Sequence, residues 1–232
     1  MGSILCLETS SKVCSVAIGK DGGILSCQES ELENAHSSQL TDLIEKALHD
    51  AGFELPDLGA IAVSMGPGSY TGLRIGVAAA KGFCYALEKP LIAIPTLKSL
   101  AYGMRELAGT EGALLCPMLD ARRMEVYTAI YDRALKEIRP VSAEIITEDS
   151  FAGFLGSGTV VFAGEGSLKC KPLLGAHKHS VFIDDFRLSA RFLYPLAMEK
   201  FRHEAFENLA YFEPYYLKDF VAGKPRVKGL KD

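Results

Sequence analysis

The sequence predicts an α/β protein made of two similar halves, each with a mixed β-sheet and helices. The chain has 232 residues of ordinary globular composition, with 48% hydrophobic and 23% charged residues. Its apolar segments alternate between the period of strands and the period of helices, and two stretches of the chain repeat each other. A chain of this length buries roughly 70% of its unfolded surface, which is enough for one large domain or two small ones.

The repeat is found by laying residues 4–18 over residues 116–130, an offset of 112 without a gap. Glu8 then falls on Asp120. Both copies read as a strand, an acidic residue, a tight turn and a second strand, and a polar turn and a third strand follow each copy. We therefore expect an antiparallel meander at the start of each half.

The repeat continues where two apolar strands each lead through a G-x-G-S turn into a helix. Residues 62–69 fall on residues 160–167, so the turn Gly66, Pro67, Gly68 and Ser69 coincides with Gly164, Glu165, Gly166 and Ser167. These later strands are joined by helical crossovers, so they should lie parallel to one another in the sheet of the meander. Because order and spacing agree over two separate segments, chance similarity of short apolar runs does not explain the match.

The helices follow from apolar spacing and from residues that begin or end a helix. A helix over 38–51 has apolar residues at helical spacing and Gly52 as its stop. The next helix begins near Thr71, and each half ends in a further strand and helix. Thr96 and Ser189 suit the N-cap positions of these last helices.

The boundary between the halves is expected in the stretch ELAGTEGA, residues 106–113. The first half then comprises residues 1–108 with the glycine-rich loop, and the second comprises residues 109–232 with a basic tail. The last ten residues, GKPRVKGLKD, carry four basic side chains. A solvated tail is the favoured interpretation, and contact with RNA is the alternative.

Two facing halves of this kind are the arrangement of the actin-like class (ASKHA, ribonuclease H-like), in which nucleotide binds between the halves. There, acidic residues after the first strands hold metal and water, and glycine-rich turns approach the phosphates. Glu8 and Asp120 could face each other across such a cleft. The turns that follow them, ETSSK and DARRM, contain no glycine, and glycine is what lets backbone N–H groups approach phosphate closely.

Two interpretations of this region stay open. One is a degraded, weak nucleotide site, and the other, which we favour, is that Glu8 and Asp120 cap their own hairpin turns. The residues of this vestigial cleft are Glu8, Gly66, Gly68, Ser69, Asp120, Arg122, Gly164 and Gly166.

The stretch GPGSYTG, residues 66–72, does not match a known phosphate-binding loop. It lacks the G-K-[ST] of a Walker A loop, and its G-x-G-x-x-x-G spacing differs from that of dinucleotide-binding loops. A tight turn from strand to helix explains it well, with Ser69 or Thr71 as the helix cap.

The helix after this turn is apolar nearly all round, and such a helix must be buried on more than one side. Its polar residues fall on one line, and its glycines are spaced so that a second helix could approach closely. Packing against helix 38–51 and an interface with another chain are both open explanations. The candidate partner-binding residues are Gln39, Asp42, Gly72, Arg74, Gly76, Val77, Ala78, Lys81 and Tyr85.

The remaining composition excludes several function classes. The net charge of −4 produces no global field that would attract nucleic acid, and no apolar run has the 18 or more residues of a membrane span. The six cysteines form no CxxC pair, so we expect reduced core cysteines and a cytoplasmic protein. No two of the five histidines are four residues apart, so we expect no metal site of the HxxxH type.

These motifs resemble those of the TsaB family, formerly called YeaZ. GPGSYTGLRIGVAAAKGF, at 66–83, is similar to the signature of that family. Glu8 departs from the family pattern, in which Asp is more frequent. The matching segments elsewhere are ILCLETSSKVCSVAI at 4–18, LDARRMEVYTAIYD at 119–132, GEGS at 164–167 and EPYYLKD at 213–219.

The resemblance implies a two-half actin-like fold and a non-catalytic subunit without a cofactor or metal of its own. Proteins of this family pair with the related TsaD, which holds the metal and transfers a threonylcarbamoyl group to the adenosine beside the anticodon of tRNA. The ATPase TsaE joins the same assembly. The resemblance thus implies contact with tRNA through the complex, while a homodimer in isolation remains open.

The competing hypothesis is a small ATP-dependent kinase or ATPase of the same fold class, with weak nucleotide binding. The missing turn glycines argue against it.

Overall fold

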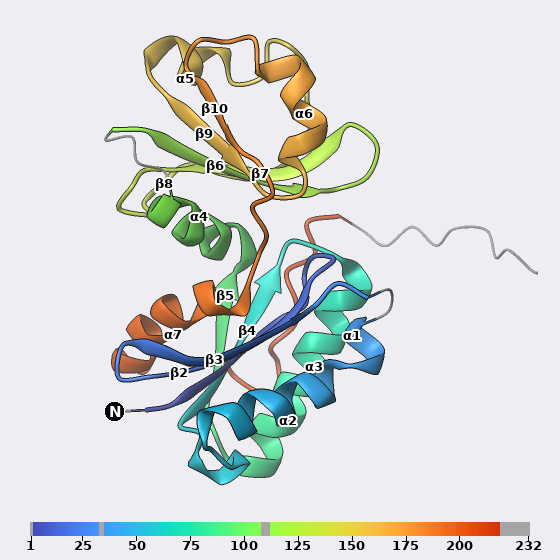
Figure 1. Cartoon of the computed structure of the whole chain (residues 1–232), viewed down its shortest axis with the longest axis vertical. Helices are drawn as coiled ribbons and strands as arrows, with labels where there is room; N and C mark the ends of the chain where they lie inside the picture. The colour runs from blue at the N-terminus through green and yellow to red at the C-terminus, as the bar shows by residue number, and fades with distance from the viewer. Residues whose placement is uncertain (1, 33–34, 108–111, 219–232) are drawn as a thin grey trace, which may run out of the picture.

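The computed structural model describes residues 2–32, 35–107 and 112–218, which form two sheets of five strands, one above the other (Figure 1). The strand order is β3-β2-β1-β4-β5 in the first sheet and β8-β7-β6-β9-β10 in the second. The two orders are equivalent, so the predicted duplication of an actin-like α/β unit is confirmed.

In each sheet the first three strands form the predicted antiparallel meander, and the other two lie parallel to the central first strand. The first sheet contains β1 (Ile4–Glu8), β2 (Cys14–Lys20), β3 (Gly23–Ser30), β4 (Ala60–Gly66) and β5 (Leu91–Pro95). The second contains β6 (Leu114–Asp120), β7 (Glu125–Tyr131), β8 (Glu137–Ile145), β9 (Val160–Ala163) and β10 (Ser180–Ile183).

One face of each sheet is covered by helices of its own half. The first sheet is covered by α1 (Ala35–Ser38), α2 (Leu40–Ala51) and α3 (Tyr70–Leu87), with the short η1 (Leu55–Asp57) before β4. The second is covered by α5 (Ala152–Ser157) and α6 (Ser167–Leu174). Alternate residues of β1, such as Leu5 and Leu7, are buried against α2 and α3, as expected for strands with a period of two.

The last helix of each half packs against the other half or between the halves. Helix α4 (Thr96–Leu107) follows β5 but packs mainly on β6, and α7 (Leu193–Arg202), after η2 (Ala190–Phe192), packs on β5, β1 and β4. Ile4 and Cys6 of the first sheet therefore share one hydrophobic core with Leu115 and Leu119 of the second. The expected boundary between residues 108 and 109 lies outside the described residues; β5 and β6, on either side of it in the chain, belong to different sheets, and α4 and α7 each pack on the other half.

After α7 the chain returns along the first half. The N–H of Glu207 donates to the carbonyl of Leu91 (2.9 Å), and the N–H of Tyr215 donates to the carbonyl of Met65 (2.7 Å). Lys218 then pairs with Glu125 of the second half. The basic stretch GKPRVKGLKD lies outside the described residues.

Within the described ranges, no helix is both long and apolar enough to cross a bilayer. All six cysteines are free, as expected for reduced thiols.

The glycine-rich stretch packs backbone to backbone against the turn after β1. The N–H of Ser69 donates to the carbonyl of Ser10 (2.7 Å), and the hydroxyl of Ser69 caps α3 by accepting from the N–H of Gly72 (3.3 Å). A Cβ on Gly68 would lie 2.4 Å from the Ser10 carbonyl oxygen, and one on Gly72 would lie 2.0 Å from that of Thr9. Glycine is required here because the strand-to-helix turn leaves no space for a side chain.

Two glycines of α3 should respond oppositely to alanine. A Cβ on Gly76 would lie 2.1 Å from Oγ1 of the buried Thr9, whereas a Cβ on Gly82 would meet nothing within 4 Å. Gly82→Ala should stabilise the protein by about 0.5–1 kcal/mol through helix propensity, while Gly76→Ala should destabilise it by about 1–3 kcal/mol through overpacking. Urea unfolding of both variants checks this. Equal effects at the two positions would contradict the described packing.

Candidate functional site

The first acidic residue of the repeat, Glu8, is fully buried at the end of β1. Its Oε1 accepts from the N–H (2.7 Å) and the hydroxyl (2.5 Å) of Ser10 and from the hydroxyl of Ser64 on β4 (2.9 Å). Oε2 has no hydrogen-bond partner among the described residues. Burial raises the pKa of Glu8 to about 6, although the hydrogen bonds from Ser10 and Ser64 oppose that change. Glu8 therefore caps its own turn, as the favoured interpretation predicted.

The second acidic residue, Asp120, also caps its own turn, but it is exposed at the mouth of the cleft. Its Oδ1 accepts from the N–H of Arg122 (2.8 Å) and from the ammonium group of Lys169 (2.5 Å). Burial raises the pKa of Asp120, but these two hydrogen bonds outweigh it and leave the pKa below its ordinary value. Arg122 and Arg123 are exposed residues in the left-handed region, with φ of 71° and 51°.

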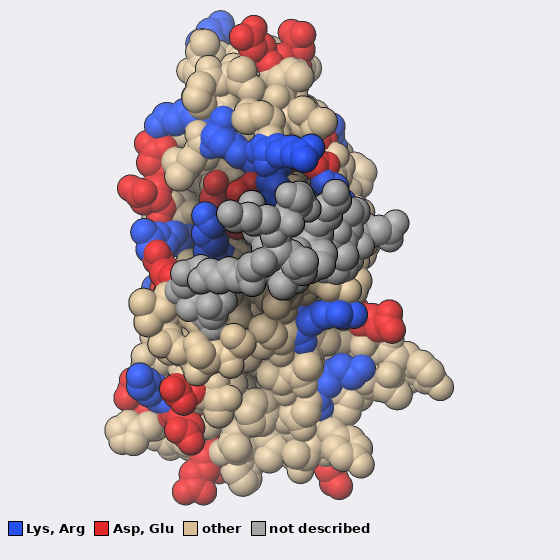
Figure 2. Space-filling view, turned by 90° about the vertical axis from the view of Figure 1, so that its right-hand side faces the viewer, with Lys and Arg blue, Asp and Glu red and all other residues tan. Residues whose placement is uncertain are grey.

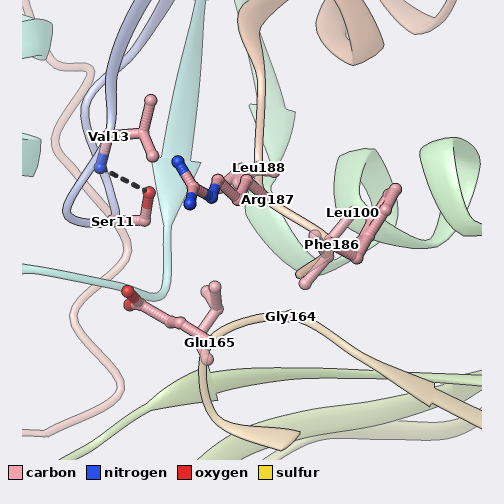
Figure 3. Close-up of a pocket in the computed structure, with 9 residues that line it drawn as sticks. Ser11, Val13, Leu100, Gly164, Glu165, Phe186, Arg187 and Leu188 are labelled. Carbon is pink, nitrogen blue, oxygen red and sulfur yellow. Dashed lines mark hydrogen bonds between the residues drawn. The ribbon is translucent and has the colours of Figure 1, made fainter. Parts of the chain in front are cut away.

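Between the halves the structure leaves a cavity of about 40 Å³ (Figure 3). Its lining is mostly apolar and comes from both halves: Ser11, Val13, Leu100, Leu119, Gly164, Glu165, Phe186, Arg187 and Leu188. Ligand pockets usually have about 300 Å³ or more, whereas one water molecule accounts for about 30 Å³. This cavity is much smaller than a usual ligand pocket.

The glycines of the second G-x-G-S turn also serve backbone packing. A Cβ on Gly164, which has a φ of +100°, would lie 2.4 Å from the carbonyl oxygen of Met118. One on Gly166 would lie 2.7 Å from the carbonyl carbon of Leu119. The vestigial-cleft glycines of both halves thus face protein backbone. Among the described residues, no group of three His, Cys, Asp or Glu side chains is placed to hold a metal ion.

The partner-binding candidates divide by exposure. Asp42, Arg74, Ala78 and Tyr85 are exposed, and Gln39 and Lys81 are partly buried. Gly72, Gly76 and Val77 are buried inside the first half, so the expectation that these glycines let a partner helix approach is wrong. Gly72 and Gly76 instead leave room for the turn after β1 to pack against α3.

The two partly buried candidates are bound within the chain itself. The hydroxyl of Ser30 donates to Oε1 of Gln39 (2.5 Å), and the ammonium of Lys81 donates to the carbonyl of Phe212 (2.9 Å). Lys81 therefore holds the returning segment against α3. It is not a free positive charge on the surface.

The outer surface of α3 is formed by small residues and one aromatic ring. Ala78 is exposed, Gly82 faces open space, and Tyr85 is 81% exposed. At the start of α3, the guanidinium of Arg74 lies 4.6 Å from the centre of the Tyr70 ring. Gly82 is not among the residues predicted from the sequence, because only the glycines at 72 and 76 were considered. Its position four residues after Ala78 places it on the same side of the helix.

The surface around α3 has little charge compared with the other half. Figure 2 shows few charged side chains over the lower half of the molecule, where the first sheet and its helices lie, and a band of Lys and Arg over the upper half. Weakly charged surface with an exposed aromatic residue is typical of contacts between proteins. We name the exposed surface of Asp42, Arg74, Ala78, Gly82 and Tyr85 the α3 face.

These features define a duplicated actin-like α/β protein. The family model of TsaD, tRNA N6-adenosine threonylcarbamoyltransferase, matches residues 20–220. The chain is 30% identical over 229 residues to the tRNA threonylcarbamoyladenosine biosynthesis protein TsaB of Escherichia coli (strain K12), covering 95% of this chain and 96% of that protein. The chain belongs to the TsaB (YeaZ) family.

Solved structures agree with this assignment. YeaZ from Pseudomonas aeruginosa is 25% identical with a TM-score of 0.77, covering 94% of this chain and 100% of that one. The activator of the 2-hydroxyisocaproyl-CoA dehydratase from Clostridium difficile, solved with bound ADPNP, is 12% identical with a TM-score of 0.51, covering 89% and 98%. The second likeness shows the fold alone.

The pKa of Glu8 predicts a pH dependence of stability. Because the pKa rises from 4.5 in the unfolded chain to about 6 in the folded protein, the folded state binds the proton more tightly. Its contribution is present below pH 4.5 and lost as the pH rises through 6, a change of about 2 kcal/mol. Glu8→Gln should therefore gain about 2 kcal/mol in unfolding free energy relative to wild type between pH 4 and pH 7.

Urea unfolding at both pH values measures this difference, with Glu148→Gln as an exposed control that should show none. A difference between Glu8→Gln and wild type that is independent of pH would contradict the raised pKa.

Proposed function

We propose that this chain is a non-catalytic scaffold and activator in tRNA threonylcarbamoyladenosine biosynthesis. It would bind a TsaD-like threonylcarbamoyltransferase and enable that subunit to transfer its group to the adenosine beside the anticodon. A TsaE-like ATPase would join the complex, and tRNA would be contacted through it. The observation that carries the proposal is that Glu8 and Asp120 are held in the turns that they cap, in a chain that belongs to the TsaB family.

The two carboxylates of the cleft support a role without catalysis. Glu8 is sealed from solvent by the turn that it caps. Asp120 is already bound by Lys169. Neither of these two carboxylates is free to act on a ligand between the halves, which argues against the enzyme hypothesis.

The α3 face supports binding to another protein. A partner helix could lie along Ala78 and Gly82, because these small side chains allow the helix axes to come close. Tyr85 supplies an aromatic anchor, and the exposed surface of α2, including Asp42, extends the contact area. In the absence of the TsaD-like partner, a second copy of the chain would use the same face and form a homodimer. We place the complex in the cytoplasm.

Ala78→Glu tests the partner surface. The added charge would be buried without a counter-charge in a helix interface, and one central change of this kind commonly costs more than about 2 kcal/mol, or roughly 30-fold in affinity. Calorimetric titration with the purified TsaD-like subunit should show that loss. Ala152→Glu on α5, also an exposed helical alanine, is the matched control and should bind as wild type does.

Circular dichroism verifies that both variants are folded. If folded Ala78→Glu binds the TsaD-like subunit with unchanged affinity, the α3 face is not the interface, which then lies elsewhere.

The purified chain alone should neither modify tRNA nor hydrolyse ATP at an enzymatic rate. The physical reason is that Glu8 and Asp120 are both held in the turns that they cap. A phosphate-release assay checks this against the roughly 1 s⁻¹ that marks the lower range of typical enzymes. A higher rate that disappears in Glu8→Ala or Asp120→Ala would establish the kinase or ATPase alternative instead.

A further inference from the structure

The turn between β6 and β7 carries two adjacent arginines on a backbone that suits glycine or asparagine better. Arg122 and Arg123 have φ of 71° and 51°, in the left-handed region that most side chains avoid. Both residues are exposed, so packing in the core does not account for either side chain. Residues held in such a conformation often belong to functional sites.

Lysine 169 of α6 holds this turn in place through its ammonium group. The ammonium of Lys169 donates to Oδ1 of Asp120 (2.5 Å). It also donates to the carbonyls of Arg123 and Glu125 (2.7 Å each). The N–H of Arg122 donates to the same Oδ1 of Asp120 (2.8 Å). These bonds use backbone atoms and one aspartate, so they hold the turn without using either arginine side chain.

The acidic residues of the turn are neutralised by lysines. Asp120 pairs with Lys169, and Glu125 pairs with Lys218 at the end of the returning segment. Within residues 2–32, 35–107 and 112–218, no carboxylate forms an ion pair with either arginine of the turn. Two positive charges are therefore left without a counter-charge in a chain whose net charge is −4. Figure 2 shows a band of Lys and Arg over the second half.

An aromatic pair lies close to this turn. Tyr216 is two residues before Lys218, which pairs with Glu125, and two residues span at most about 7 Å. The ring of Tyr216 lies 4.8 Å from the ring of Tyr70 at the start of α3, and Tyr216 is 36% exposed. In the sequence, four basic residues follow in the last ten positions. Aromatic and basic side chains are thus combined where the two halves meet.

This combination of groups is suited to single-stranded nucleic acid. A guanidinium group binds phosphate oxygens in a bidentate way, and the unstacked bases of an RNA loop stack on aromatic rings. Proteins that bind single strands join basic side chains along the backbone to such rings. Because both arginines are exposed on a turn, they suit an extended polyanion better than a small anion enclosed in a pocket.

We propose that the β6–β7 turn binds RNA directly, with Arg122 and Arg123 on the phosphates of a single-stranded loop and the ring of Tyr216 against a base. The choice of RNA rests on the proposed function, in which the substrate of the assembly is a tRNA. The inference goes beyond that function because it gives this chain a contact with RNA of its own. Arg122 and Arg123 are not part of the α3 face.

The double variant Arg122→Asn/Arg123→Gly tests the arginines without straining the turn. Asparagine and glycine accept a positive φ more readily than arginine, so the variant should unfold in urea at the wild-type concentration or above it. The purified full chain should bind a labelled RNA stem-loop that carries the anticodon loop, with a Kd of about 10⁻⁴ M or tighter by fluorescence anisotropy. The variant should bind it about tenfold or more weakly.

The salt dependence separates phosphate contacts from other effects. For single strands, each lost phosphate contact reduces the slope of log K against log salt by about 0.7, so the double variant should lose about 1.4. The control is Lys136→Gln/Lys178→Gln, which removes the same charge from exposed lysines before β8 and β10. These lie at the opposite edge of the second sheet, because β10 runs parallel to β6 and β7 antiparallel to it. The control should bind RNA as wild type does.

Tyr216→Ala tests the contact with a base. Stacking of one base contributes enough that its loss should weaken binding about fivefold or more, while the salt slope stays at the wild-type value. Tyr216→Phe keeps the ring and should restore the affinity.

Several results would overturn the proposal. They are no binding of the stem-loop by wild type, an unchanged Kd or salt slope in Arg122→Asn/Arg123→Gly, and an unchanged Kd in Tyr216→Ala. A loss of stability in the double variant would show that the arginines hold the turn, which also contradicts it. If that variant binds RNA normally but no longer binds the TsaD-like subunit, the turn contacts protein instead. Calorimetric titration with the TsaD-like subunit tests the proposed function separately, since the RNA measurements use this chain alone.

Discussion

The close contact between the glycine-rich stretch and the turn after β1 determines much of the structure. Because Gly68 and Gly72 lack side chains, the start of α3 lies directly on the backbone of Thr9 and Ser10. This contact buries Glu8, whose carboxylate accepts hydrogen bonds from the hydroxyl groups of Ser10 and Ser64. The space beside this turn is thus taken by protein backbone. The same contact directs the outer surface of α3 away from the sheet.

The second constraint is the exchange of helices between the halves. Helix α4 leaves the first sheet to pack on the second, and α7 returns from the second to pack on the first. Each half therefore buries apolar surface against a helix that the other half supplies. Ile4 of the first half and Leu115 of the second belong to one hydrophobic core. A hinge opening between the halves would expose that core to water, at a cost of about 25 cal/mol for every Å² of apolar surface. Burial of this shared core therefore favours close contact between the halves.

The sequence predicted the fold well because its information was local and repeated. The strand and helix periods, the stop at Gly52 and the cap at Ser69 all act within a few residues, and the repeat supplied each element twice. The candidate site was harder to predict. Helical spacing places Gly76 and Gly82 equally well on a helix surface, and only the position of Thr9, which lies far away in the sequence, decides that Gly76 is buried and Gly82 exposed. The hydrogen bond from Lys81 to Phe212 joins residues still farther apart, so an apparently free lysine was in fact engaged.

The chain retains some residues expected of an actin-like fold, but these residues have other roles here. The frame keeps the two acidic residues after the first strands, but both are used as turn caps and one of them is buried. It keeps the glycines of both G-x-G-S turns, but they make room for backbone instead of phosphate. Conversely, the outer surface of α3 is not needed by the core, since Ala78, Gly82 and Tyr85 contribute little to it. Helix α3 is thus apolar on its inner side, and most of its exposed outer side is uncharged. In this chain, then, the outer surface of α3 is exposed, whereas the turns beside the cleft are packed against protein backbone.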